Sequence, residues 1–292
     1  VSSMTSEELS PGTVIEPGYR VNRLIGSGGM GNVWAATDLA TGREVAIKSI
    51  PLATSSEERY RRLIREARVG MAFRHPNVVA VYDVVEPEWE RPVVVMELLH
   101  GESLRALLTR VGRLSLGTTT RIMLPVISAV IAANELGIVH RDLKPDNIFL
   151  AQIDGGTVPK VLDFGIARLT ASAGLLAAST VLTAAGALIG TLAYMAPEQL
   201  LGEPVDHLAD IWSLGAILYE CLSGGRPIEP IGYGYIVGHY LNAGITPLGA
   251  ANPELATDVA EIVSQMLVRD RDERNSDLRK VHQVFSAHSN DA

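Results

Sequence analysis

The sequence is poor in cysteine and has no excess of positive charge. The first shortage bears on the compartment in which the protein works, and the second on the partners it can bind. Cys221 is the only cysteine among 292 residues, so no disulfide can form within the chain. This favours a reducing compartment, and we expect a cytoplasmic protein with Cys221 in its core. Acidic residues outnumber basic ones, 33 to 25, which gives a formal net charge of −8. A chain without a broad basic face is not expected to bind nucleic acid.

The sequence also lacks the usual signals for secretion and membrane insertion. Residues 1–8 contain no basic stretch followed by an apolar run, so a signal peptide is not expected. Residues 169–197 have no charged side chain and are numerous enough to cross a membrane. This stretch is rich in Ala, Ser, Thr and Gly rather than Leu, Ile and Phe, and it lies between two motifs that must share one side of any membrane. We therefore expect no membrane segment in this chain.

The composition is that of a chain with a packed core. Hydrophobic residues make up 47% and charged residues 20% of the sequence, and the length suggests one large domain or two lobes. Hydrophobic periodicity predicts both helices and strands. Strands are expected at residues 19–25, 33–38, 44–48, 78–84 and 92–96, with a hairpin formed by 148–150 and 160–162. Helices are expected at residues 55–74, 103–109, 118–136, 206–223, 256–267 and 278–285.

Two short polar motifs bring together the groups that phosphoryl transfer needs. The first motif is His140–Asn147, in which Asp142 precedes Lys144 by two residues. The second is an Asp-Phe-Gly triplet that starts at Asp163. One carboxylate can accept a hydroxyl proton, a second carboxylate and an amide can hold Mg²⁺ through oxygen, and a lysine can neutralise a phosphate. Phosphoryl transfer depends on such positioning and positive charge more than on covalent chemistry by the protein.

A glycine-rich turn between two predicted strands adds a phosphate-binding element. Gly26, Gly28 and Gly31 would let backbone N–H groups approach phosphate oxygens without hindrance from a Cβ atom. The same pattern occurs in dinucleotide-binding folds, where a helix follows the glycines. Here a strand at residues 33–38 is expected to follow, which argues against the dinucleotide-binding fold.

Together these motifs resemble those of the eukaryotic-type serine/threonine protein kinase family, and most of all its bacterial members. The resemblance spans residues 19–286. It implies an α+β, bilobal protein-kinase fold, with a small β-rich N-lobe that carries one long helix and a larger helical C-lobe. The implied activity is transfer of the γ-phosphoryl group of ATP to Ser and Thr hydroxyls of protein substrates. The implied boundaries are a leader at 1–18, the N-lobe at 19–97, the C-lobe at 98–286 and a tail at 287–292.

The resemblance assigns the ATP site to the first strands and to the hinge between the lobes. Lys48, which ends the sequence Val-Ala-Ile-Lys, would contact the α- and β-phosphates and pair with Glu66 on the following helix. Met96 would lie beside the adenine, and backbone groups of Glu97 and Leu99 would bond to its edge. The implied nucleotide-binding residues are Gly26, Ser27, Gly28, Gly29, Met30, Gly31, Val33, Ala46, Lys48, Met96, Glu97 and Leu99.

The same resemblance implies roles for the residues of the polar motifs. Asp142 would accept the proton of the substrate hydroxyl, Lys144 would neutralise the γ-phosphate, and Thr191 would place its hydroxyl beside both. Lys144 and Thr191 at these positions are typical of serine/threonine rather than tyrosine kinases. Asn147 and Asp163 would hold Mg²⁺, with Mn²⁺ as the alternative metal.

Two later motifs imply contacts that hold the C-lobe together. Glu198 ends the segment Gly190–Glu198, which resembles the peptide-docking segment of the family. Glu198 is expected to pair with Arg274, with Arg271 as the second choice. Asp210 is expected to fix the backbone of the catalytic loop.

The segment between the Asp-Phe-Gly triplet and Glu198 is expected to regulate activity. Arg141 places a positive charge beside the catalytic aspartate, and in the family such an arginine is commonly matched by a phosphate. Thr183 is the first choice for this phosphorylation and Thr180 the second. The alternative is that both are small polar residues in an Ala-rich loop. Autophosphorylation at this segment would bring two chains together as a homodimer.

Two other functions fit parts of the pattern. A pseudokinase scaffold would be marked by loss of Lys48, Asp142, Asn147 or Asp163, and all four are present. A small-molecule phosphotransferase, such as an aminoglycoside or choline kinase, has a related fold. The intact Gly190–Glu198 segment argues against that second alternative.

Overall fold

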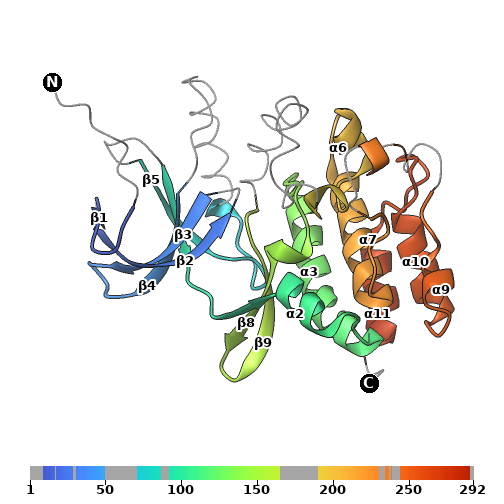
Figure 1. Ribbon diagram of the computed structural model, residues 1–292, viewed down its shortest axis with the longest axis horizontal. Coiled ribbons are helices and arrows are strands. Elements are labelled where there is room, and N and C mark those ends of the chain that lie inside the picture. Colours follow the sequence, from blue (N-terminus) through green and yellow to red (C-terminus); the bar gives the residue numbers. More distant parts are fainter. Residues whose placement is uncertain are drawn as a thin grey trace. The chain divides into compact units, whose positions relative to one another are not determined.

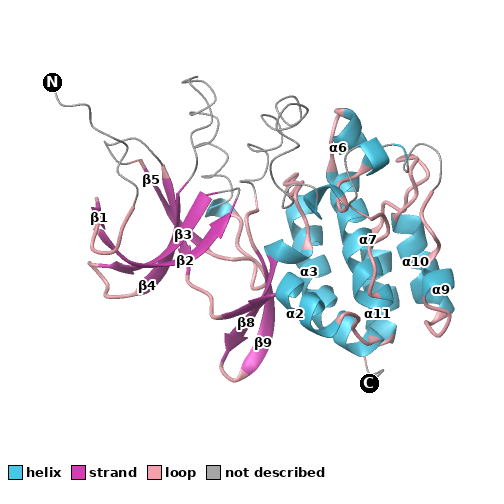
Figure 2. Cartoon of the chain, viewed as in Figure 1, coloured by secondary structure: helices cyan, strands magenta, loops and turns pink. Residues whose placement is uncertain are grey.

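The computed structural model describes residues 9–16, 18–28, 31–49, 71–86, 92–164, 190–229, 234–236, 238 and 244–289. The chain divides into two compact units (Figure 1). The first holds the chain up to Arg74 together with Val79–His100, and the second holds His75–Val78 and the chain from Gly101 onward. Strands form most of the described part of the first unit, and helices form most of the second (Figure 2). These units correspond to the predicted strand-rich and helix-rich lobes.

The first unit is built on one antiparallel sheet with the strand order β1-β2-β3-β4-β6-β5. Successive side chains of a strand point to opposite faces of a sheet. On one face the buried side chains of Trp34, Ile47 and Val95 lie in register across three strands and belong to the core cluster of this unit. The strands are β1 (Val14–Ile15), β2 (Tyr19–Gly28), β3 (Gly31–Asp38), β4 (Glu44–Ser49), β5 (Val81–Val85) and β6 (Val93–Glu97).

The sheet begins earlier in the chain than the sequence predicted. Val14 pairs with Arg20 and Ile15 pairs with Tyr19, and Ile15 is fully buried in the core cluster. The prediction of a loose leader up to residue 18 is therefore wrong at these two positions. A two-residue strand is too short to show the alternation of apolar and polar residues by which strands are recognised.

The strand predicted at residues 78–84 is shifted in the structure. Strand β5 starts at Val81, and Val78 instead forms an isolated parallel bridge with Val161 of the second unit. A turn at Pro76 and Asn77 directs the chain there, and the N–H of Val78 donates to the carbonyl of His75. The apolar run that starts at Val78 is therefore divided between the two units. The sequence pattern gave no sign of where this division falls.

The second unit is a bundle of helices around the buried helix α7. Helix α7 packs against α3, α9 and α10, while α11 packs against α3 and α10. All residues of α7 from Ala209 to Leu222 are buried. The helices are α2 (Leu104–Val111), α3 (Leu116–Glu135), the 3₁₀ turn η1 (Pro145–Asn147), α6 (Pro197–Leu201), α7 (His207–Ser223), α9 (Leu248–Ala251), α10 (Thr257–Met266) and α11 (Leu278–Ala287).

Helix α3 is long and apolar enough to cross a membrane, and among the described residues it alone has this property. Just over half of its apolar window, 56%, is buried inside the second unit. The helix packs against α7, α11 and strand β9, so the core of this unit accounts for its apolar side chains. The uncharged stretch at 169–197, which the sequence singled out, lies mostly outside the described residues.

A small three-stranded sheet completes the second unit. Strands β7 (Gly101–Ser103), β8 (Ile148–Ile153) and β9 (Gly156–Val161) pair in that order. The predicted hairpin is confirmed, and its turn places Asp154 and Gly155 at φ values of 49° and 77°. Beyond β9 the N–H of Leu162 donates to the carbonyl of Asn147 at 2.9 Å. The hairpin therefore brings the Asp-Phe-Gly triplet back to the catalytic loop.

Candidate active site

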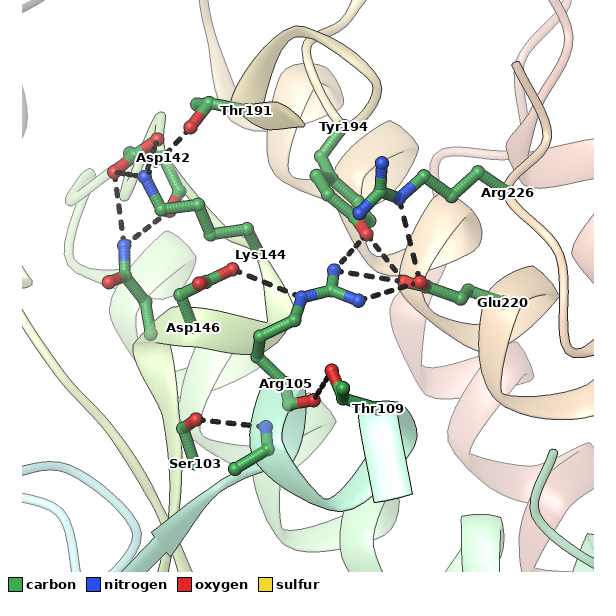
Figure 3. A network of polar contacts seen from close by, with 12 residues as sticks. Ser103, Arg105, Thr109, Asp142, Lys144, Asp146, Thr191, Tyr194, Glu220 and Arg226 are labelled. Atoms are coloured by element: carbon green, nitrogen blue, oxygen red, sulfur yellow. Dashed lines mark hydrogen bonds and ion pairs between the residues drawn. The ribbon is translucent and has the colours of Figure 1, made fainter. Parts of the chain in front are cut away.

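Asp142, Lys144 and Thr191 meet at one point of the second unit, although Thr191 is 47 residues further along the chain than Lys144 (Figure 3). The ammonium of Lys144 lies 2.9 Å and 3.2 Å from the two carboxylate oxygens of Asp142. It also donates to the hydroxyl of Thr191 at 3.3 Å. Asp142 and Lys144 are both largely buried. A carboxylate, an ammonium group and a hydroxyl thus share one small volume.

Asn147 is oriented by Asp142. Its side-chain N–H₂ donates to the backbone carbonyl of Asp142 at 2.8 Å and to its carboxylate at 3.0 Å. Because both hydrogen bonds use the nitrogen, the amide oxygen points away from Asp142 and can serve as a metal ligand. Mg²⁺ prefers oxygen ligands and is commonly held by one or two protein groups plus phosphate oxygens and waters. The amide oxygen of Asn147 and the carboxylate of Asp163 fit that donor set.

The backbone of the catalytic loop is held by Asp210 of helix α7, as predicted. Its two carboxylate oxygens accept the N–H groups of His140 and Arg141, each at 2.8 Å. Arg141 has a φ of 68°, a conformation that costs energy for a residue with a Cβ atom. Complete burial raises the pKa of Asp210, while His140 and the backbone donors act in the opposite direction. Helix α6 adds a second contact, since Gln199 donates to the carbonyl of Arg141 at 2.8 Å.

His140 links the catalytic loop to the Asp-Phe-Gly triplet. The N–H of Asp142 donates to His140 Nδ1 at 3.3 Å, which assigns the ring proton to Nε2. Nε2 then donates to the carbonyl of Leu162 at 2.7 Å. The ring of Phe164 packs edge-on against the imidazole, with 4.7 Å between centroids. Asp163, between Leu162 and Phe164, has a φ of 60°, so both neighbours of this residue are fixed by His140.

In the first unit, four predicted nucleotide-binding residues share one face of the sheet. Val33 pairs with Lys48 and Ala46 pairs with Met96, and Ala46 and Lys48 lie two positions apart on β4. Side chains that are paired across strands, or two residues apart along one, point to the same face. This face is opposite the core cluster that contains Trp34. Lys48 is buried, with 6% of its surface exposed.

The remaining nucleotide-binding predictions concern the glycine turn and the hinge. Gly26 pairs with Val33, Ser27 with Asn32, and Gly28 with Gly31. The N–H of Glu97 donates to the carbonyl of Ala80 at 2.8 Å, so the backbone group of Glu97 that could serve an adenine is its carbonyl. Leu99 follows the end of β6. Gly29, Met30, Glu66, Thr180 and Thr183 lie outside the described residues.

The predicted pair of Glu198 and Arg274 is confirmed. The guanidinium bonds to both carboxylate oxygens, at 2.8 Å and 3.0 Å, and both side chains are buried. Arg271, the second choice, instead pairs with Asp206 at 2.5 Å near the surface. Cys221 is confirmed as a core residue, and burial raises the pKa of its thiol.

The catalytic-loop geometry, the hairpin and the sheet with its glycine turn are the features expected of a protein kinase domain. The protein kinase domain family matches residues 19–287, and the chain belongs to that family. A probable serine/threonine-protein kinase of Corynebacterium efficiens is 40% identical over 220 residues, which cover 74% of this chain and 32% of that protein. Serine/threonine-protein kinase PknA of Mycobacterium tuberculosis is 36% identical over 269 residues, which cover 90% of this chain and 59% of PknA. The predicted family and its bacterial type are thereby confirmed.

Solved structures agree on the fold. The crystal structure of the Mycobacterium tuberculosis PknI kinase domain matches with a TM-score of 0.72 at 24% identity. The match covers 96% of this chain and 99% of that one, and it confirms the predicted α+β kinase fold. This chain spans only about a third to three-fifths of the length of the curated relatives that it matches.

Two polar residues beside the catalytic loop were missed by sequence reasoning. Gln199 holds the carbonyl of Arg141, and Arg105 contacts Glu220 and Tyr194. One signal was available, because Glu220 is an acidic residue inside the apolar run of helix α7. A buried carboxylate needs a partner, but the sequence gives no means of choosing Arg105 over the other arginines.

Proposed function

We propose that this chain is a serine/threonine protein kinase that transfers the γ-phosphoryl group of ATP to Ser and Thr hydroxyls of protein substrates. The observation that carries the proposal is the meeting of Asp142, Lys144 and Thr191 beside Asn147. Asp142 supplies the acceptor of a hydroxyl proton, Lys144 a cation for phosphate oxygens and Asn147 an oxygen ligand for a metal. Phosphoryl transfer requires all three in one place.

In the proposed reaction Asp142 acts on the substrate hydroxyl. Its carboxylate orients the hydroxyl and accepts its proton as the oxygen bonds to the γ-phosphorus and the bond from that phosphorus to the oxygen of ADP breaks. Lys144 already lies within 3.3 Å of both Asp142 and Thr191, so its charge would neutralise the γ-phosphate. Thr191 would orient the acceptor side chain. This assigns proton acceptance and charge neutralisation to separate side chains.

Asn147 and Asp163 are proposed to hold the metal. Bound Mg²⁺, or Mn²⁺ in its place, would supply positive charge to the phosphate oxygens. The carboxylate of Asp163 would contribute full charge and the amide of Asn147 a dipole. Among the described residues no three His, Cys, Asp or Glu side chains are grouped so that they could hold a metal ion. A metal held by Asn147 and Asp163 would therefore take its other ligands from phosphate and water.

ATP is proposed to lie on the face of the first unit that carries Val33, Ala46, Lys48 and Met96. Backbone groups of residues 26–31 would surround the phosphates, and Lys48 would bond to the α- and β-phosphates. Glu66 would pair with Lys48. Backbone groups of Glu97 and Leu99 would bond to the adenine edge.

Regulation is proposed to act through the segment before Thr191. Thr183, or Thr180 as the second choice, would be autophosphorylated by a second copy of the chain in a homodimer. Residues 169–197 contain no charged side chain, so a phosphate would be the strongest electrostatic group of that segment, with a charge of roughly −1.5 to −2. We also propose a cytoplasmic location, which suits a chain whose one cysteine is a buried thiol.

The test is to incubate the purified chain with Mg-ATP and an added protein substrate, and to map phosphate on both by mass spectrometry. We expect phosphoserine and phosphothreonine on the added protein, and none when EDTA removes the metal. ATP binding without any transfer would identify a pseudokinase instead. Transfer to a small molecule but not to protein would identify a small-molecule phosphotransferase.

A further inference from the structure

A guanidinium group outside the predicted catalytic set lies beside the active site. Arg105 is on the first turn of helix α2, whose N-terminus is capped by the hydroxyl of Ser103. Its side chain bonds to both carboxylate oxygens of Glu220, at 2.8 Å and 3.2 Å, and to the hydroxyl of Tyr194. Its Nε lies 3.5 Å from the carboxylate of Asp146. Figure 3 shows the guanidinium between Asp146 on one side and Tyr194 and Glu220 on the other.

The anchor of this group is the carboxylate of Glu220. Glu220 is 6% exposed and belongs to the buried helix α7. It also accepts the hydroxyl of Tyr194 at 2.5 Å and lies 3.6 Å from Nε of Arg226. Burial by itself would lower the pKa of Arg105, but the hydrogen bonds to Glu220 and the electrostatic effects of Tyr194, Glu220 and Asp146 together outweigh it, and the pKa is raised. Burial and the nearby carboxylate raise the pKa of Tyr194. Arg105 therefore stays charged and the hydroxyl of Tyr194 stays protonated at neutral pH.

Arg105 joins the two chain segments that form the active site. Asp146 directly precedes Asn147, whose amide bonds to the carboxylate of Asp142. Tyr194 follows Thr191 by three residues, and the N–H of Tyr194 donates to the carbonyl of Thr191 at 3.2 Å. The catalytic loop and the turn 191–194 thus share one guanidinium as a common contact. A shift of Arg105 would change the distance between them.

Each segment also has its own attachment to helix α7. The hydroxyl of Ser213 donates to the carbonyl of Tyr194 at 2.8 Å, and Asp210 holds the backbone of the catalytic loop. Loss of Arg105 would leave these attachments in place. What would be lost is the bridge through Arg105, while the hydrogen bond from Lys144 to Thr191 would remain. The expected effect is therefore on the relative position of the two segments and not on their folding.

We propose that Arg105 is a positioning residue for the protein substrate. Arg105 holds the turn that carries Thr191 in its place beside Asp142. This inference rests on the proposed kinase function and deepens it. The turn 191–194 belongs to the segment that resembles the peptide-docking segment, whereas the predicted nucleotide-binding side chains are in the other unit. A substrate hydroxyl would therefore meet Asp142 less often when Arg105 is replaced, while ATP would bind as before.

The test is steady-state kinetics on a Ser-containing peptide with the variants Arg105→Met and Arg105→Lys. We expect Arg105→Met to lower kcat/KM for the peptide by about 10- to 100-fold, since a misplacement of about 1 Å can cost that much. The dissociation constant for Mg-ATP should stay unchanged. Arg105→Lys should recover part of the loss, because lysine restores the charge but cannot bond to two oxygens of Glu220 at once.

The matched control is Arg110→Met on the same helix. Arg110 pairs with Glu102 at 2.5 Å, but 60% of its side chain is exposed. An exposed pair contributes little, so this variant should keep the peptide kinetics of the wild type. A second variant, Tyr194→Phe, removes only the hydroxyl that contacts Arg105 and Glu220. It should lower kcat/KM for the peptide several-fold, again with unchanged ATP affinity, and it decides the question if Arg105→Met does not fold.

Wild-type kcat/KM in Arg105→Met, or in Tyr194→Phe if the first variant is unfolded, would overturn the inference. A parallel fall in peptide kinetics, ATP affinity and melting temperature would also overturn it, because Arg105 would then only stabilise the fold. Absence of peptide phosphorylation by the wild type is a different result, since it would refute the proposed function on which the inference rests.

Discussion

Replacement of Arg274 by Met should destabilise the second unit strongly. Arg274 has no exposed side-chain surface, and its partner Glu198 is 2% exposed. Besides the two bonds to Glu198, its guanidinium donates to three backbone carbonyls at 3.0 to 3.2 Å. All five N–H groups of the guanidinium therefore have an acceptor. Its carbon also lies 5.0 Å from the ring centroid of Trp212.

The expected loss of stability follows from the acceptor groups that the substitution leaves without a donor. Methionine has a similar length but no donor, so a buried carboxylate and three carbonyls would lose their partner. Removal of one member of a buried ion pair typically costs about 3–5 kcal/mol. At about 2–4 °C per kcal/mol for a domain of this size, the melting temperature should fall by roughly 6–20 °C. Glu198→Gln should cost less, because Arg274 would keep its three backbone acceptors.

The assay is urea unfolding followed by far-UV circular dichroism, which reports on the helices and not on the nearby Trp212. The matched control is Arg279→Met, which removes an ion pair with Glu135 whose side chains are 76% and 54% exposed. An exposed pair contributes about 0–1 kcal/mol. If Arg274→Met lowered the free energy of unfolding no more than Arg279→Met does, the structural role assigned to the buried pair would be refuted.

Three further changes have expected outcomes. Asp163→Ala should weaken Mg²⁺-dependent ATP binding more than Asn147→Ala, because it removes a full charge rather than a dipole; equal losses in ATP titrations with and without Mg²⁺ would contradict this. Gly101→Ala should destabilise the second unit by at least about 1–3 kcal/mol in the same urea assay, since Gly101 has a φ of +144° and an added Cβ would lie 2.1 Å from the carbonyl oxygen of Leu150. Unchanged stability would show that the strand can shift. Cys221 should resist alkylation at pH 8 in the folded protein and react in urea, because burial raises the pKa of its thiol; fast reaction of the native protein would contradict its place in the core.

Much of the fold was predictable because its elements carry strong local patterns. The strands that contain Lys48 and Met96 and the hairpin after Asn147 were predicted to within one to four residues. The chemistry of the catalytic loop was also predictable, since Asp142, Lys144 and Asn147 lie within six residues of one another. In such cases the local sequence contains most of the information about the structure.

Contacts between distant segments were predictable only by resemblance. The pair of Glu198 and Arg274 joins residues 76 positions apart, and the family pattern supplied it. No such pattern pointed to Arg105, which reaches Glu220 115 positions away. Strand β1 was missed for another reason, because its two residues acquire their structure from pairing with β2 and from burial of Ile15. Tertiary packing, and not local preference, determines such features.

The role of Asp142 as proton acceptor is tested most directly by the rate of phosphoryl transfer by Asp142→Asn in a single turnover on a peptide substrate. Asparagine has nearly the same shape as aspartate but cannot accept the hydroxyl proton. Loss of an acid–base group typically slows a reaction by about 10²–10⁴-fold. We expect that loss together with an affinity for Mg-ATP close to that of the wild type. A transfer rate near that of the wild type would contradict the assignment of Asp142 and, with it, the proposed mechanism.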